Sequence, residues 1–264
     1  MIDKQKLLNS IVNREDKIVF SKIIDKLLFC QKKYENTFTD FMPMLKYLEF
    51  NTILSKEYIE QNVLAYGGFE EAERVIIGFF PEYIEKDINY FPISILEITY
   101  NKKYSKELTH RDFLGSILGL GIDRAKVGDI AINDNKAICF LYDDIIEYVN
   151  INLERVSSTK VNTKIVKIKD YNIPKANIEE KNIIISSLRL DSVLSGAFNI
   201  SRGKISDYIK GEKAFLNFVI ETNGSKNIKE NDIITLRGVG RIKVLSIVGK
   251  TKKDRIVLNI GKYV

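Results

Sequence analysis

The spacing of hydrophobic residues changes near Arg74, and this change constrains the fold more than any other feature of the sequence. Upstream, apolar residues recur at helical intervals, as they do from Phe20 to Leu28, and form one stripe along a helix. Downstream, the apolar runs are short and rich in β-branched and aromatic residues, a composition typical of strands. The sequence therefore predicts an α+β protein that begins with a small helical domain over residues 1–66.

Residues 67–170 are predicted to form a ferredoxin-like domain of the kind found in RNA-recognition domains. From Ile93 onward the expected order is β-α-β-β-α-β, which gives a split βαβ sheet with both helices on one face. The expected elements are a strand at Ile93–Tyr100, a helix that begins at a Thr109 capping box, strands at Asp129–Ile132 and Ala137–Leu141 around a turn at Asn133-Asp134-Asn135, a helix at Asp143–Leu153 and a strand near Val161–Ile168. The run at Val75–Phe80 is a candidate extra strand of this sheet. Residues 136–141 lack the interleaved basic and aromatic residues that stack bases in RNA-recognition domains, so we expect the fold without that binding mode.

Basic residues are concentrated towards the C-terminus. The chain has 41 Lys and Arg against 35 Asp and Glu, a net charge of +6. Residues 181–264 alone hold 16 basic and 7 acidic residues, a net charge of +9, so the remainder is slightly acidic. A basic module beside a near-neutral body is expected of a domain that binds a polyanion, either nucleic acid or an anionic membrane face. Residues 171–180, which are polar and contain Pro174, are the expected linker into this module.

The content of cysteine and histidine excludes several classes of site. The chain has 1 His and 2 Cys, and the apolar neighbours of Cys30 and Cys139 predict that both thiols lie in the core. A disulfide framework and a zinc site built from Cys and His are thereby excluded, whereas magnesium bound by carboxylates alone is not. No cofactor, metal or membrane insertion is predicted. The N-terminus lacks the pattern of a signal peptide, so we expect a cytoplasmic protein.

The C-terminal module, residues 181–264, is predicted to contain two short helices followed by strands. The helices begin near Arg189 and at a Ser201 cap, and strand-like runs follow from Ala214 onward. This layout is expected to bring helix N-termini and cations together at one end of the module, where they favour phosphate. The residues expected at that end are Arg189, Ser201, Arg202, Lys204 and Lys213.

Residues 187–248 resemble the αL-type RNA-binding domain named after the fourth small-subunit ribosomal protein. The motifs that carry the resemblance are Arg189-Leu190-Asp191, Ser201-Arg202, the segment from Lys213 to Asn217, and Asp232-Ile233-Ile234. In one departure, the expected glycine lies a residue early, at Gly211, and Glu212 occupies its usual place. The resemblance implies an RNA-binding surface that consists of Arg189, Ser201, Arg202, Lys204, Lys210, Lys213, Asn217, Arg237 and Arg241.

The chain as a whole resembles the bacterial YlmH family. The matching motifs are Tyr66-Gly67-Gly68-Phe69-Glu70-Glu71-Ala72-Glu73-Arg74, His110-Arg111-Asp112-Phe113-Leu114-Gly115 and the segment from Gly119 to Asp129. The resemblance implies a non-enzymatic RNA-binding protein with ribosomal RNA, tRNA and the large ribosomal subunit as partners. It further implies a role in rescuing stalled large subunits that hold peptidyl-tRNA and, in some bacteria, a link to cell division. A candidate second RNA-binding surface comprises His110, Arg111, Arg124 and Lys126, the alternative being that these residues only fix the start of a helix and the neighbouring turn.

Two other functions stay open at this point. The segment from Arg189 to Gly196 resembles the catalytic stretch of pseudouridine synthases, although Leu194 replaces a threonine there. Asp191 is therefore either a nucleophile or a residue that starts a helix. The second alternative is a scaffold for cell-division or membrane partners. The basic run from Lys250 to Arg255 is also open to two interpretations, a solvated hairpin turn or an extension of the phosphate-binding surface.

Overall fold

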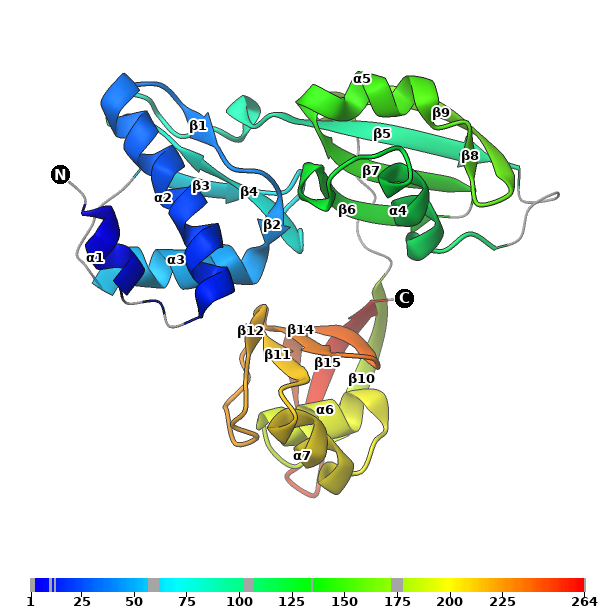
Figure 1. Cartoon of the computed structure of the whole chain (residues 1–264). Coiled ribbons are helices and arrows are strands. Elements are labelled where there is room, and N and C mark those ends of the chain that lie inside the picture. Colours follow the sequence, from blue (N-terminus) through cyan, green and yellow to red (C-terminus); the bar gives the residue numbers. More distant parts are fainter. Residues whose placement is uncertain are drawn as a thin grey trace. The chain divides into compact units, whose positions relative to one another are not determined.

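The chain folds into two compact units, residues 1–173 and residues 174–264 (Figure 1). The computed structural model describes residues 3–9, 11, 13–56, 62–101, 107–133, 135–171 and 178–263. The central residue of the predicted turn at Asn133-Asp134-Asn135 and most of the predicted linker, including Pro174, lie outside these ranges. The expectation of an α+β protein with N-terminal helices is confirmed, and the described strands form three antiparallel sheets.

Three helices begin the chain: α1 (Lys4–Asn9), α2 (Arg14–Lys33) and α3 (Met44–Lys56). Helix α2 starts at Asn13, whose side chain accepts a hydrogen bond from the backbone of Glu15, and it ends at Tyr34, which is left-handed. The apolar stripe predicted from Phe20 to Leu28 is buried except for Leu28, which is partly buried. The Phe20 ring stacks on Phe50 of α3 with ring centroids 6.1 Å apart. Burial of this stripe packs the helices against one another and against a small sheet.

The small sheet is formed by β1 (Thr37–Phe38), β2 (Met42–Pro43), β3 (Val63–Tyr66) and β4 (Arg74–Phe79). Strand β4 pairs with the other three. The suggestion that residues 75–80 extend the middle sheet is therefore wrong, because pairing partners depend on contacts distant in sequence. The boundary expected between residues 66 and 67 falls between two paired strands, and the N-terminal part is not purely helical.

The middle sheet has the strand order β6-β7-β5-β9-β8. Its strands are β5 (Ile93–Tyr100), β6 (Val127–Asn133), β7 (Lys136–Tyr142), β8 (Arg155–Val156) and β9 (Thr159–Lys167), and its helices are α4 (His110–Leu118) and α5 (Asp143–Asn152). Short 3₁₀ turns lie at Ile88–Tyr90, Arg124–Lys126 and Ile168–Asp170. The expected capping box is present, since Asp112 accepts hydrogen bonds from the backbone and the hydroxyl of Thr109, at 2.8 and 2.6 Å.

Both faces of the middle sheet are covered. On one face, alternate strand residues such as Leu96 and Cys139 pack with Phe113 of α4 and Val149 of α5. On the opposite face, Ile95, Ile138 and Phe140 pack with Phe41, Ile76, Phe80 and Phe91. This second face is the one on which RNA-recognition domains stack bases on exposed aromatic residues. Here its aromatic ring, Phe140, is fully buried, which agrees with the absence of the basic and aromatic pattern in the sequence.

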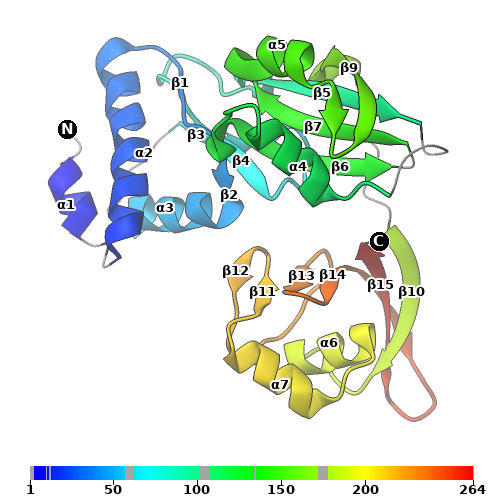
Figure 2. The ribbon, with the colours of Figure 1, turned by 45° about the vertical axis from the view of Figure 1, so that its right-hand side comes forward.

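The C-terminal unit is a sheet in the order β10-β15-β14-β13-β11-β12 with two helices, which lie together on one side of it (Figure 2). Its elements are β10 (Ile178–Ile185), α6 (Leu190–Phe198), α7 (Arg202–Lys210), β11 (Ala214–Leu216), β12 (Val219–Ile220), β13 (Ile233–Leu236), β14 (Gly240–Lys250) and β15 (Ile256–Tyr263). The two predicted helices are confirmed. Residues 178–180, which the sequence assigned to the linker, instead begin β10, because this strand pairs with β15 along its whole length.

Candidate nucleic-acid interface

Arg189 and Asp191 form a bidentate ion pair at the start of α6. The Nε and Nη2 atoms of Arg189 donate to the two carboxylate oxygens of Asp191 at 3.1 and 2.8 Å. This contact holds the pKa of the Asp191 carboxyl below its usual range. Arg189 is the N-cap residue of α6 and Asp191 lies in its first turn, where a carboxylate is favoured by the helix dipole. Asp191 is therefore a charged helix-starting residue that orients an exposed arginine.

Arg202 reaches back from the start of α7 to the same place. Its Nη2 atom donates to the hydroxyl of Ser192, at 2.7 Å, and to the hydroxyl of Ser186. Both bonds use one nitrogen, so the guanidinium is oriented while its other N–H donors keep their capacity for a ligand. Ser201 caps α7 as predicted, accepting from the backbone of Lys204 at 3.5 Å. We call Ser186, Arg189, Asp191, Ser192 and Arg202 the arginine–serine cluster.

The two serines of this cluster were not among the residues predicted from the sequence. Ser192 is almost fully buried and Ser186 lies between the end of β10 and the start of α6. A buried hydroxyl needs a hydrogen-bond partner, and here the partner is the guanidinium of Arg202. The only sequence signal is the position of Ser192 one residue after Asp191, which does not by itself indicate a contact with a residue ten positions further on.

The other predicted RNA-binding residues lie elsewhere on the unit. Lys213 follows the last turn of α7, whereas Lys204 lies in its first turn, so the expectation that both meet at one end is wrong. The ammonium of Lys213 lies 5.5 Å from the Tyr208 ring centre, and the backbone N–H of Arg237 donates to the Lys213 carbonyl. The helix between them separates the two groups, because α7 rises by about 9 Å from Lys204 to its end at Lys210.

Aromatic rings accompany these cations. The guanidinium of Arg237 lies 5.1 Å from the Phe215 ring centre, and that of Arg241 lies 5.6 Å from Phe218 and 5.5 Å from Tyr263. Such contacts orient arginine side chains without neutralising their charge. We call Lys213, Arg237 and Arg241, with the rings that they contact, the cation–aromatic row.

Asn217 and Glu212 have backbone roles. The side-chain amide of Asn217 donates to Asp232 at 2.9 Å, and its oxygen accepts from the backbone of Ile233 at 2.9 Å. These bonds hold the turn between β11 and β12, so Asn217 is engaged within the protein. Glu212 has a φ of 55°, in the left-handed region that favours glycine. Glu212, which occupies the glycine position of the αL-type pattern, thus keeps a backbone conformation typical of glycine. Its exposed carboxylate lies beside Lys213 in the chain. Lys210 is exposed at the end of α7.

In the candidate second surface, Arg124 and Lys126 are engaged in internal contacts. The ammonium of Lys126 lies 2.9 Å from Asp40, 2.7 Å from Asp144 and 4.0 Å from the centre of the Tyr142 ring. Arg124 donates to the carbonyls of Val127 and Gly128. These two cations hold turns in place. His110 and Arg111 are exposed on the first turn of α4. Partial desolvation of the imidazole and the charge of Arg124 lower the pKa of His110.

The motif from Tyr66 to Arg74 likewise supports the fold. Arg74 donates to the carbonyls of Phe41 at 2.9 Å, Val127 at 3.0 Å and Arg124 at 3.3 Å, so it ties the small sheet to the middle sheet. Burial and the neighbouring Arg124 lower its pKa to about 10. Asp129 accepts from the backbone of Glu73 at 2.6 Å. We call Arg74, Arg124 and Asp129 the polar joint.

The polar joint predicts a pH dependence of stability. Burial raises the pKa of Asp129 to about 6, above the value of about 3.9 in an unfolded chain. The folded chain therefore binds this proton more tightly than the unfolded chain does. The resulting contribution to folding stability is fully present below pH about 4 and is lost as the pH rises through about 6. We expect Asp129→Asn to gain stability relative to the natural chain by about 3 kcal/mol between pH 4 and pH 8. Urea unfolding at several pH values checks this. If the difference in stability between Asp129→Asn and the natural chain were the same at every pH, the prediction would be wrong. Asp25→Asn, at an exposed carboxylate, is the control.

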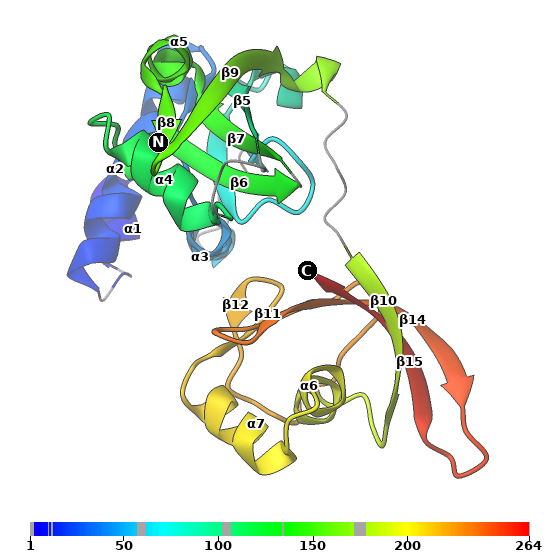
Figure 3. The ribbon, with the colours of Figure 1, turned by 90° about the vertical axis from the view of Figure 1, so that its right-hand side faces the viewer.

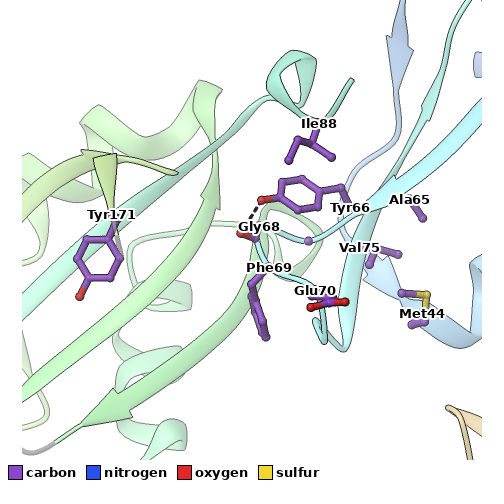
Figure 4. Close-up of a pocket in the computed structure, with 10 residues that line it drawn as sticks. Met44, Ala65, Tyr66, Gly68, Phe69, Glu70, Val75, Ile88 and Tyr171 are labelled. Carbon is purple, nitrogen blue, oxygen red and sulfur yellow. Dashed lines mark hydrogen bonds between the residues drawn. The ribbon is translucent and has the colours of Figure 1, made fainter. Parts of the chain in front are cut away.

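An open groove of ≈ 600 Å³ lies beside the motif from Tyr66 to Arg74 (Figure 4). Its wall includes Tyr66, whose hydroxyl donates to the Gly68 carbonyl at 2.7 Å, together with Phe69, Glu70 and Tyr171. The Glu70 carboxylate would repel phosphate, so we leave this groove out of the nucleic-acid interface.

The described ranges contain no group of three or more His, Cys, Asp or Glu residues able to hold a metal ion. Both cysteines are buried, as predicted. None of the described helices has the length and apolarity needed to cross a membrane.

Comparison with known proteins finds similar proteins. Residues 87–170 match the model described as "Putative RNA-binding domain in YlmH". The "Ribosome-associated protein quality control protein P2" of Bacillus subtilis (strain 168) is 27% identical over 243 residues, which cover 92% of this chain and 93% of that protein. The chain is thus similar to proteins of the YlmH family. The solved structure of cell division protein ylmH from Streptococcus pneumoniae, 21% identical with a TM-score of 0.50, covers 60% of this chain and 95% of that chain, and it supports the fold alone. The residues of the polar joint come from the motifs from Tyr66 to Arg74 and from Gly119 to Asp129, which carry the resemblance to the YlmH family.

Proposed function

We propose that this protein is a non-enzymatic RNA-binding protein that docks on structured ribosomal RNA or tRNA of the large ribosomal subunit through its C-terminal unit. Binding relies chiefly on phosphates and shape, because no side-chain pattern that reads base edges is present in the arginine–serine cluster. The name of the Bacillus subtilis relative, which refers to the ribosome and to protein quality control, points the same way. A protein that works on ribosomes works in the cytoplasm.

The observation that carries the proposal is the arginine–serine cluster. Two arginines from different helices converge on one site, each oriented by a partner: Arg189 by Asp191, and Arg202 by two serine hydroxyls. Fixed guanidinium groups beside the first turns of two helices match the geometry of phosphate oxygens. The net charge of +9 on residues 181–264 favours long-range attraction to RNA.

We assign the folds of the middle domain and of the C-terminal unit from their topology. The order β6-β7-β5-β9 with both helices on one face is that of a ferredoxin-like domain, and the helix pair followed by strands is that of an αL-type domain. Since the second face of the middle sheet is covered by aromatic residues, any RNA contact of the family's putative RNA-binding domain has to use its edges or helices. Exposed His110 and Arg111 are the candidates there.

The pseudouridine-synthase alternative is less well supported by the geometry. A nucleophilic aspartate has to reach a base, whereas the Asp191 carboxylate holds Arg189 through both oxygens. We therefore keep Asp191 as a positioning residue for Arg189. The scaffold role in cell division rests on the name of the Streptococcus pneumoniae relative alone.

Sucrose-gradient sedimentation of the full chain with purified large subunits tests the proposal. We expect the natural chain to co-migrate at low salt and the variant Arg189→Gln, Arg202→Gln, Lys204→Gln to remain at the top of the gradient. Three lost phosphate contacts would also lower the slope of log K against log salt by about 2–3.

The matched control removes three exposed charges from α2, by Lys22→Gln, Lys26→Gln and Lys32→Gln. It has the same net charge as the variant but should co-migrate with the subunits. If both variants lost co-migration with the subunits equally, binding would depend only on net charge. If both co-migrated equally, the arginine–serine cluster would not be part of the interface. Circular dichroism of each variant establishes that it is folded.

A further inference from the structure

The hairpin between β14 and β15 carries a dense positive charge. Residues 250–255 read Lys-Thr-Lys-Lys-Asp-Arg, with four cations and one carboxylate. The carboxylate of Asp254 pairs with Lys250 at 2.7 Å, within the hairpin itself. Lys252, Lys253 and Arg255 are all exposed. We call residues 250–255 the basic hairpin.

The turn of the basic hairpin is ordered by its own backbone. The backbone of Thr251 donates to the Arg255 carbonyl at 2.8 Å, and the Thr251 hydroxyl accepts from the backbone of Arg255 at 3.2 Å. Asp254 is left-handed, with a φ of 57°. The turn therefore presents its cations from a defined backbone shape, so less conformational entropy is lost when they bind a ligand.

The basic hairpin extends beyond the hydrophobic core (Figure 3). The core residues of β14 end at Val244, and the following Ile247 and Val248 are 43% and 58% exposed. Two irregularities in the pairing of β14 with β15, at Val244/Ser246 and Ile247/Gly249, lie in this stretch. Such bulges bend a strand and increase its twist, which changes the direction of the hairpin.

Strand register places the basic hairpin next to the arginine–serine cluster. Ile256, the first residue after the hairpin, pairs with Lys250 on one side and with Ile185 on the other. Ser186 directly follows Ile185, and its hydroxyl binds Arg202. The basic hairpin and Ser186 of the arginine–serine cluster thus lie at the same end of strands β14, β15 and β10.

We infer that the basic hairpin and the arginine–serine cluster together bind neighbouring phosphates in the backbone of one RNA. This inference rests on the proposed function and adds a second contact to it, outside the residues that resemble the αL-type pattern. Exposed cations next to two oriented guanidinium groups give a continuous positive track, and a polyphosphate backbone is the partner that it complements.

RNA is favoured over an anionic membrane by the neighbours of the hairpin. A hairpin that inserts into a bilayer has apolar residues at its tip that enter the lipid, whereas here the tip is charged and the exposed aliphatic residues, Ile247 and Val248, lie behind it. The oriented guanidinium groups of the arginine–serine cluster suit phosphates held in a fixed array.

Site-directed cleavage of RNA tests the inference. Cys30 and Cys139 are buried, so a thiol-reactive iron–EDTA probe can be attached selectively to the full chain at Lys253→Cys or at Gly203→Cys. A Cβ at Gly203 has no atom within 4 Å, so that variant is tolerated. On large ribosomal subunits, we expect both probes to cleave the same RNA element, within a few nucleotides of each other.

The outcomes separate the two proposals. No cleavage from Gly203→Cys would overturn the proposed function. Cleavage from Gly203→Cys with none from Lys253→Cys, or cleavage in unrelated RNA elements, would overturn only the inference about the hairpin. A probe at Lys32→Cys on α2 serves as the control for random encounters and should leave that element uncut.

A salt titration gives an independent measurement. The variant Lys252→Gln, Lys253→Gln, Arg255→Gln is expected to bind large subunits about tenfold more weakly, with a slope of log K against log salt lowered by about 2–3. The triple lysine variant of α2 is the matched control. If affinity for subunits is unchanged while binding to phosphatidylglycerol vesicles is lost, the hairpin is a membrane contact and the inference is wrong.

Discussion

Gly68→Ala is expected to destabilise the first unit by about 3–5 kcal/mol, a large part of the stability of a typical domain. Gly68 has a φ of +102°, and a Cβ there would lie 2.3 Å from a ring carbon of Phe140. Phe140 is fully buried in the covered face of the middle sheet, so its ring has no room to move. Backbone strain and overpacking therefore act together.

Two other glycines separate these contributions. Gly121 has a φ of +84° with no atom near a Cβ, so Gly121→Ala should cost only the strain, about 1–2 kcal/mol. Gly115 lies within α4 with no atom near a Cβ, so Gly115→Ala should be neutral or stabilising by up to about 1 kcal/mol. Urea unfolding followed by circular dichroism gives the three values. Similar costs at Gly68 and Gly121 would mean that the Phe140 contact relaxes.

Arg74→Met is expected to cost the same unit about 3–5 kcal/mol. The substitution keeps an unbranched apolar stem but removes the donors to the carbonyls of Phe41, Val127 and Arg124. The three carbonyls would then lack hydrogen-bond donors at the joint between the two sheets, where water cannot easily supply new ones. Arg74→Lys should be intermediate, because an ammonium cannot span the three carbonyls as a guanidinium does.

Differential scanning calorimetry of the full chain provides the measurement, since the two units allow separate transitions. The expected result is a lower transition for the first unit with the C-terminal unit unchanged. Arg111→Met, at an exposed arginine, is the control and should change stability by less than about 0.5 kcal/mol. A stability loss at Arg74 as small as that at Arg111 would show that the polar joint does not hold the unit together.

These two predictions bear on function as well. The motif from Tyr66 to Arg74 carries part of the family resemblance, and its glycines and arginine make backbone and packing contacts. We expect variants there to lose RNA binding only insofar as they unfold the first unit. Variants of the arginine–serine cluster should instead lose RNA binding while the fold persists, and this difference separates structural from binding residues.

The sequence by itself determined features that depend on neighbouring residues. The stripe from Phe20 to Leu28, the capping box of Thr109 and Asp112, and the Ser201 cap are all found where their local patterns predict them. Helical periodicity and caps involve residues within about one or two turns, so the information lies within a short window. The concentration of basic residues in 181–264 is equally independent of the fold.

Only the tertiary structure decided which distant residues meet. It paired β4 with β1, β2 and β3, and it covered the face of the middle sheet on which related folds stack bases. It separated Lys213 from Lys204 by the length of a helix, and it joined Arg202 to Ser186 and Ser192. The physical reason is that strand register and side-chain contacts between elements are set by packing of the whole core, so residues far apart in the chain become neighbours without any local signal.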